Sequence, residues 1–183
     1  MSVSALAYYE NIAEDYDEET KNPIMLAEDI VLFDFLKMEN LIQGKVLDAG
    51  CGTGLFIDQC YWPKWKVSSY NGYDLSEAML DKFGKKWPSF KNDIHNMSFL
   101  DEHDKFGNTF DTVVSLYAGL NCLTRSEMKK AFENIWHCTK PGGTICLMTY
   151  GNIEPENRST SLHSIVAHKK GYAYSMVEVC VLW

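Results

Sequence analysis

An apolar run that ends in three closely spaced glycines is the feature that most constrains this chain. The segment KVLDAGCGTGLF, residues 45–56, carries apolar residues before Asp48 and glycines at Gly50, Gly52 and Gly54. A short apolar run bounded by turn residues is typical of a buried strand. Glycine tolerates positive φ and lets another group approach the backbone closely. The pattern therefore predicts a strand followed by a loop that is built around a ligand.

Strand and helix patterns alternate through the middle of the chain. Helical periodicity or helix-end signals mark four segments, and Thr124 with Glu127 forms a capping box before the clearest of them. Such alternation predicts an α/β fold: a doubly wound, Rossmann-like, mostly parallel sheet with helices on both faces. The strands are expected at 45–49, 68–74, 89–94, 110–116 and 144–151. The helices are expected at 22–44, 76–87 and 124–140, and one more begins at residue 55.

The C-terminal segment leaves two arrangements open. Residues 174–183 are apolar in both alternating sets, which predicts a strand covered on both faces and lying inside the sheet. If residues 161–169 form its antiparallel partner through a turn at Lys170-Gly171, the sheet is complete and a monomer suffices. If they are helical, the sheet lacks a full C-terminal hairpin and a homodimer should cover the edge. We favour the hairpin.

Composition narrows the classes of function. The 183 residues include 17 basic and 25 acidic side chains, a formal charge of -8, with no basic run. This balance argues against nucleic acid or an anionic membrane as a partner. The six scattered cysteines lack a C-x-x-C pair, so reduced thiols in a cytoplasmic protein are expected rather than disulfides or a bound metal. No stretch reaches the roughly 18 apolar residues of a membrane span.

The spacing of the glycines distinguishes between ligands. A nicotinamide dinucleotide fold would require G-x-G-x-x-G, whereas here the last required position holds Leu55. An acid beside the loop suits a ligand with ammonium and sulfonium cations better than it suits a pyrophosphate. The segment LDAGCGTG in fact resembles the D-x-G-x-G-x-G motif of class I S-adenosylmethionine-dependent methyltransferases, of the small-molecule type. The resemblance continues in order through residues 46–151.

The resemblance implies one domain, residues 1–183, with three parts. Residues 1–44 would form a helical lid, 45–151 the cofactor-binding core, and 152–183 a substrate-side segment with the last strand. The N-terminal segment matches the Y-x-x-x-A-x-x-Y-D pattern of small-molecule methyltransferases, in which Tyr9 and Tyr16 would close over the cofactor. An acidic helix whose tyrosines pack on the body is the alternative for this segment.

The resemblance also assigns the residues that would contact S-adenosylmethionine. The three glycines would lie against its methionine part, and Asp48 would orient its amino group, directly or through water. Asp74 would accept hydrogen bonds from both ribose hydroxyls. Capping of the following helix, for which Ser76 is the other candidate, is the alternative role of Asp74. Leu75 and Met79 would flank the adenine, Asp93 and Ile94 would hold its edge, and Tyr117 and Asn121 would contact the acceptor. The alternatives are core positions for Met79 and Tyr117, a surface loop for Asp93 and a helix cap for Asn121.

Methyl transfer from a sulfonium is an in-line displacement that depends mainly on proximity and the exclusion of water. No catalytic base is identified: His137 fits a structural role, and His163 or His168 of the tail could serve. The expected function is transfer to an N or O atom of a small-molecule substrate. A cofactor-binding regulatory or partner protein is the alternative. A nucleic-acid methyltransferase is disfavoured by charge and by the absence of an N-P-P-Y motif after the fourth strand.

Overall fold

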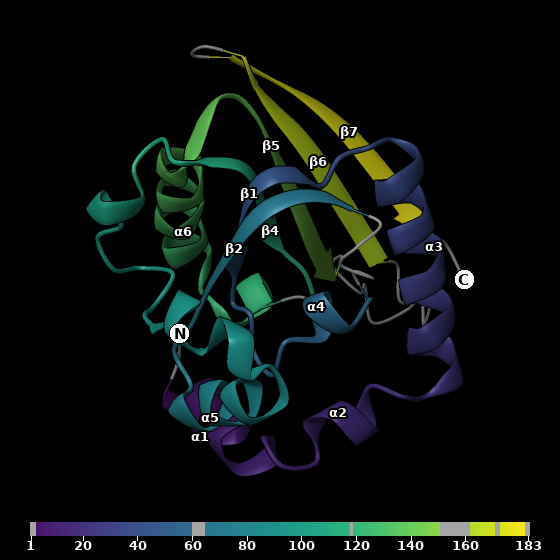
Figure 1. Cartoon of the computed structure of the whole chain (residues 1–183), viewed down its shortest axis with the longest axis vertical. Coiled ribbons are helices and arrows are strands. Elements are labelled where there is room, and N and C mark those ends of the chain that lie inside the picture. Colours follow the sequence, from purple (N-terminus) through teal and green to yellow (C-terminus); the bar gives the residue numbers. More distant parts are fainter. Residues whose placement is uncertain (1–2, 60–64, 118, 151–161, 171–172, 182–183) are drawn as a thin grey trace.

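The computed structural model describes residues 3–59, 65–117, 119–150, 162–170 and 173–181. A seven-stranded sheet with the order β3-β2-β1-β4-β5-β6-β7 forms its centre (Figure 1). The strands are β1 Gln43–Ala49, β2 Lys66–Asp74, β3 Ile94–Asn96, β4 Phe110–Ser115, β5 Thr139–Tyr150, β6 Leu162–Lys170 and β7 Ala173–Val181. The helices are α1 Val3–Ile12, α2 Tyr16–Glu19, α3 Pro23–Met38, α4 Leu55–Gln59, α5 Glu77–Lys86 and α6 Arg125–Cys138, with short 3-10 turns η2 Pro88–Asp93, η3 Asp104–Phe106 and η4 Gly119–Cys122.

Strands β1 to β5 are parallel, which confirms the predicted doubly wound sheet. Strand β1 pairs with β2 on one side and with β4 on the other, so the order of the strands reverses between β1 and β4. In open α/β sheets, ligands bind outside the carboxyl ends of the strands at such a switch point. The glycine loop that follows β1 is located at this point.

Side chains alternate between the two faces of the sheet, and each face has its own core. Val46 and Val114 face α3, α4 and α5. Their neighbours Leu47 and Val113 face α6 instead. The apolar strands read as nearly continuous hydrophobic runs because both faces are covered.

The starts of α5 and α6 follow the capping signals of the sequence. The capping box of Thr124 and Glu127 is present, and the Ser76 hydroxyl accepts the backbone N–H of Met79 at the start of α5. Helix α3 departs from the expectation, because it ends at Met38 rather than near residue 44. The helical spacing of Met25, Ile30, Phe33 and Leu36 predicts one buried face, but Ile30 is 65% exposed.

The third strand was predicted at 89–94 and lies elsewhere. Residues Pro88–Asp93 form the 3-10 turn η2, and β3 covers only Ile94–Asn96. These three residues pair in parallel with Gly72–Asp74. A strand of three residues is too short to carry a hydrophobic period, so the sequence gives little information about its position.

The C-terminal strands form the predicted hairpin. β6 pairs antiparallel with both β5 and β7, so the sheet has its C-terminal hairpin. The turn predicted at Lys170-Gly171 involves a residue outside those described. The prediction that residues 174–183 form an interior strand is wrong, because β7 is the edge strand beyond β6. An apolar pattern on both sides indicates that two faces are covered, and does not determine whether a strand has two neighbours.

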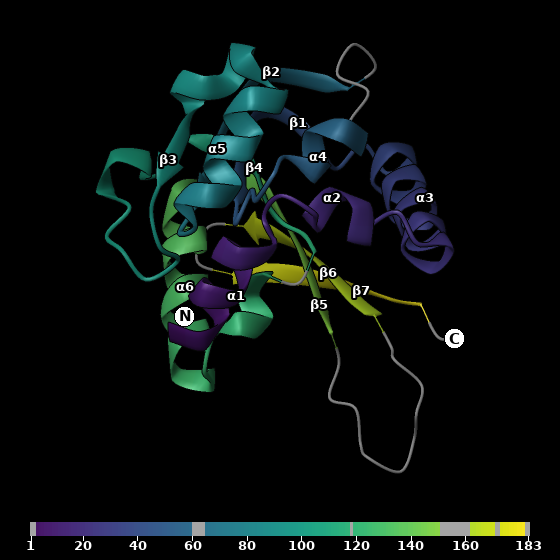
Figure 2. The same cartoon turned by 90° about the horizontal axis from the view of Figure 1, so that it is seen from below.

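The N-terminal segment lies across the end of the sheet that carries the glycine loop (Figure 2). Asp17 of α2 accepts hydrogen bonds from the Thr53 hydroxyl and from Lys86 Nζ, the latter at 2.9 Å. Partial burial favours a higher pKa, but these two hydrogen bonds hold the pKa of Asp17 below its ordinary value. Lys82 Nζ also donates to the carbonyl of Glu14. The segment is therefore attached both to the glycine loop and to α5.

Candidate active site

The glycine loop has the backbone conformation that its sequence predicts. Gly50, Gly52 and Gly54 have φ values of 79°, 51° and 90°, which disfavour other residues. The backbone N–H of Gly50 donates to the Tyr73 carbonyl at 2.8 Å and ties the loop to β2. A Cβ atom added to Gly50 would lie 2.8 Å from the ring of Phe99, whereas one added to Gly52 would meet nothing within 4 Å. Gly52 therefore borders open space.

Asp74 ends β2 beside this open space. Its Oδ2 accepts the backbone N–H of Gly52 at 2.9 Å, and its Oδ1 accepts that of Ser76 at 2.9 Å. The N-cap of α5 is Ser76, so Asp74 does not cap this helix itself. Burial raises the pKa of Asp74 and the backbone hydrogen bonds oppose that rise. A carboxylate has about four acceptor positions, so lone pairs remain for a ligand after these two bonds.

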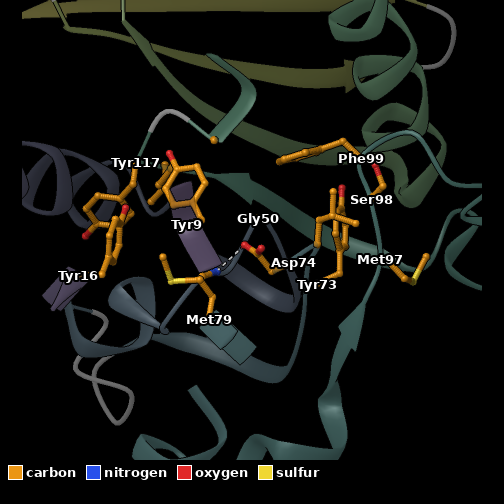
Figure 3. A pocket seen from close by; sticks show the side chains of 14 residues that line it. Tyr9, Tyr16, Gly50, Tyr73, Asp74, Met79, Met97, Ser98, Phe99 and Tyr117 are labelled. Carbon is orange, nitrogen blue, oxygen red and sulfur yellow. Dashed lines mark hydrogen bonds between the residues drawn. The ribbon is translucent and has the colours of Figure 1, made fainter. Parts of the chain in front are cut away.

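These groups line a pocket that is partly open to solvent (Figure 3). We call it the glycine-loop pocket. Asp74 carries the only formal charge among the described side chains that line it. Eight predicted site residues are in the lining: Tyr9, Tyr16, Gly50, Gly52, Asp74, Leu75, Met79 and Tyr117.

Asp48 does not line the pocket. It lies within β1, and its side chain is on the sheet face that carries α3 to α5. There it accepts a hydrogen bond from the Tyr70 hydroxyl at 2.9 Å and is only 2% exposed. Burial raises the pKa of Asp48 to about 7, with the nearby Asp74 adding to the rise and the Tyr70 hydrogen bond opposing it.

Three further residues that were predicted to bind the cofactor lie outside the lining of the glycine-loop pocket. Gly54 faces the core, because an added Cβ atom would come within 2.9 Å of the ring of Phe83. Asp93 ends η2, and Ile94 begins β3 two residues before the end of that strand. Both therefore lie before the carboxyl end of β3, the edge at which the pocket opens.

The structure adds pocket residues that the sequence analysis did not find. The additional lining residues are Tyr73, Met97, Ser98, Phe99, Leu116 and Gly119. Met97 to Phe99 directly follow β3, and the side chain of Asn96 donates to the carbonyl of Leu75 at 2.9 Å. The carboxyl end of the third strand does carry pocket residues, as the sequence analysis assumed. That strand was predicted at 89–94, a few residues before its actual position, so the wrong residues were chosen.

A second pocket adjoins the first and shares three tyrosines with it. We call it the tyrosine pocket; its lining residues are Tyr8, Tyr9, Tyr16, Glu19, Thr20, Met25, Tyr117, Asn121 and Cys122. The rings of Tyr9 and Tyr16 are 6.1 Å apart at 71°, and those of Tyr8 and Tyr9 are 5.3 Å apart at 74°. The Cys122 thiol donates to the Tyr9 hydroxyl at 3.5 Å. Burial raises the pKa of Tyr9, which stays protonated.

Tyr117 stands where the two pockets meet. Its φ of 57° is strained for a residue with a side chain, and its backbone N–H donates to the sulfur of Met148 at 3.1 Å. Its hydroxyl interacts with buried Asp29, which also accepts from Gln59 Nε2 at 3.0 Å. Burial raises the pKa of Asp29 to about 6, so this carboxyl is mostly ionised at neutral pH.

No histidine with a described side chain lines either pocket. His103 is buried with Nε2 3.0 Å from the Ser98 carbonyl, and His137 is exposed on α6. The side chains of His163 and His168 lie outside the described part. Among described residues, no group of three potential ligands is placed to hold a metal, and no helix has the length and apolar character that a bilayer crossing requires.

Comparison with known proteins assigns this site to a family. A family model described as a methyltransferase domain matches residues 46–143, which contain the glycine loop and strands β2 to β4. The chain belongs to this methyltransferase family. No curated protein matches the sequence significantly.

Solved structures share the methyltransferase fold at low identity. An S-adenosylmethionine-dependent methyltransferase from Clostridium acetobutylicum ATCC 824 is 16% identical, with a TM-score of 0.58 over 91% of this chain and 79% of the other. The DhpI-SAM-HEP complex is 20% identical, with a TM-score of 0.65 over 84% and 67%. The sugar N-methyltransferase KedS8 from Streptoalloteichus sp ATCC 53650 is 15% identical, with a TM-score of 0.55 over 92% and 76%.

Proposed function

We propose that this methyltransferase transfers the methyl group of S-adenosylmethionine to an N or O atom of a small molecule. The observation that carries the proposal is the position of Asp74 beside the open face of Gly52. Two backbone N–H groups fix the carboxylate, which leaves acceptor positions for a pair of ribose hydroxyls. The missing side chain of Gly52 leaves room for the cofactor to approach the backbone.

The charge of the pocket fits this cofactor. S-adenosylmethionine has a sulfonium and an ammonium group, and the only formal charge in the described lining is the carboxylate of Asp74. A pyrophosphate would meet this carboxylate without a cationic partner among the described lining residues. One fold neighbour is named as a complex with SAM, which agrees with the proposal.

The cofactor supplies an activated methyl group when it is bound. The task of the chain is then to position the acceptor and exclude water. Tyr9 and Tyr16 cover the glycine-loop pocket from the N-terminal segment, and their attachment through Asp17 holds them there. We assign acceptor contacts to Tyr117, which lines both pockets, and to Asn121, which lines the tyrosine pocket.

Calorimetry with purified protein tests the cofactor assignment. S-adenosylmethionine and S-adenosylhomocysteine should bind, and Asp74→Ala should weaken the binding by about 1.5–3 kcal/mol because two hydroxyls lose a charged acceptor. Asp93→Ala is the matched control, since Asp93 is an acid near the same edge but outside the pocket lining. Tighter binding of NAD than of either compound, or equal losses in the two variants, would refute the assignment.

A further inference from the structure

The tyrosine pocket has a composition that the transfer of a methyl group does not by itself require. Four tyrosines and Met25 make up most of its described lining. The successive rings of Tyr8, Tyr9 and Tyr16 are nearly perpendicular, so they form adjoining walls rather than a stack. Tyrosine rings carry negative π-faces and offer no cationic group to a ligand.

The charged groups described in this lining or directly behind it are acidic. Glu19 is the only charged residue in its described lining, and Asp29 lies behind Tyr117 as a buried carboxyl. No described lysine, arginine or histidine lines either pocket. The backbone N–H of Met25, at the start of α3, already donates to the Asn22 side chain at 3.0 Å. An acceptor with a carboxylate or phosphate at its reacting end would therefore find no cationic partner among the described groups.

We propose that the acceptor atom is an amine nitrogen and that the tyrosine pocket stabilises the positive charge that forms on it. This inference rests on the proposed function. In the transfer, the lone pair of the neutral amine forms the new N–C bond, and the electrons of the C–S bond remain on sulfur. The sulfonium becomes a neutral thioether while the nitrogen becomes an ammonium, which later loses a proton to solvent.

Two physical reasons favour nitrogen over a hydroxyl. An amine that binds in its neutral form, with its proton left in solvent, already offers its lone pair, whereas a hydroxyl requires a base to remove its proton. No histidine with a described side chain lines either pocket. The positive charge also moves from sulfur to nitrogen during the reaction. The tyrosine rings and the Glu19 carboxylate of the lining therefore stabilise the transition state more than they stabilise the neutral amine.

The test uses two probes of the same shape that differ in charge. Choline and 3,3-dimethyl-1-butanol are titrated by calorimetry into protein saturated with S-adenosylhomocysteine. The quaternary ammonium reproduces the charge that forms on nitrogen, so choline should bind about tenfold more tightly than its neutral isostere. Glu19→Gln and Tyr8→Leu should each lower choline affinity severalfold, and Tyr8→Phe should retain it, because its ring keeps the π-face.

S-adenosylhomocysteine affinity separates this inference from the proposed function. Tyr8 and Glu19 line the tyrosine pocket and not the glycine-loop pocket, so these variants should bind S-adenosylhomocysteine as the parent protein does. Normal binding of that compound combined with equal or no binding of the two probes would overturn the amine assignment alone. Failure of the parent protein to bind S-adenosylhomocysteine would instead refute the proposed function, and the amine assignment with it.

Discussion

The buried carboxyl of Asp48 should make the stability of this protein depend on pH in an unusual direction. Its folded pKa of about 7 lies above its ordinary value of 3.8. Between these values the folded state binds more protons than the unfolded state, so stability falls as pH rises. An acid with a lowered folded pKa would produce the opposite slope. The destabilisation is complete only above pH 7 and disappears below about pH 4.

The size of the effect follows from the same values. From pH 5 to pH 8, a group that moves from 3.8 to about 7 costs the folded state about 2–3 kcal/mol. Solvent screens this charge little, because Asp48 is only 2% exposed. Asp48→Asn removes the charge and keeps an oxygen to accept the bond from Tyr70. The new amide N–H groups lack a known partner, which offsets part of the gain by about 1 kcal/mol.

Urea unfolding followed by tryptophan fluorescence measures this difference. At pH 8 the Asp48→Asn variant should be more stable than the parent by about 1–2 kcal/mol, and at pH 5 it should be equal or slightly less stable. Asp29, with its own raised pKa, is present in both proteins and cancels in the comparison. Parallel pH profiles for the two proteins would show that Asp48 is ionised at little cost, and the argument from burial would fail.

Two substitutions in the glycine loop and one in the N-terminal segment give further predictions. Gly52→Ala should cost about 1–2 kcal/mol of stability from positive φ alone, yet weaken S-adenosylhomocysteine binding at least tenfold by calorimetry. Gly54→Ala adds a clash with an aromatic ring, so it should cost about 2–5 kcal/mol in urea unfolding; equal stability losses would contradict this contrast. Asp17→Asn weakens the attachment to Lys86, so stopped-flow dissociation of S-adenosylhomocysteine should become severalfold faster than in the exposed control Glu18→Gln. A rate unchanged from the control would show that the attachment does not retain the ligand.

The sequence predicted the parts of the fold that rest on long local patterns. The parallel core, the capping box at Thr124 and the Ser76 cap depend on residues within one element or its ends. Ile30 was wrongly placed in the buried face of α3, because a mostly apolar helix carries little information about which side faces the core. The position of the third strand was predicted wrongly because a strand of three residues is too short to show a hydrophobic pattern.

The site was predictable where glycine or a strand end determines geometry. Gly52 and Asp74 are in the pocket because both belong to the switch point of the sheet. Asp48 does not line the pocket. Side chains alternate along β1, so Asp48 lies on the same face as Val46, toward α3 to α5, rather than at the strand end. Met97 to Phe99 could be found only from the register between β2 and β3, which depends on tertiary pairing.

The three tyrosines shared by the two pockets form a wall with a pocket on either side. Tyr9 and Tyr16 come from the N-terminal segment, and Tyr117 comes from the end of β4. A ligand that orders this wall from one side leaves less entropy to be lost when the other ligand binds. By thermodynamic reciprocity, the factor by which the cofactor tightens acceptor binding equals the factor by which the acceptor tightens cofactor binding. A substitution that adapts this wall to a new acceptor therefore also changes the affinity for the cofactor.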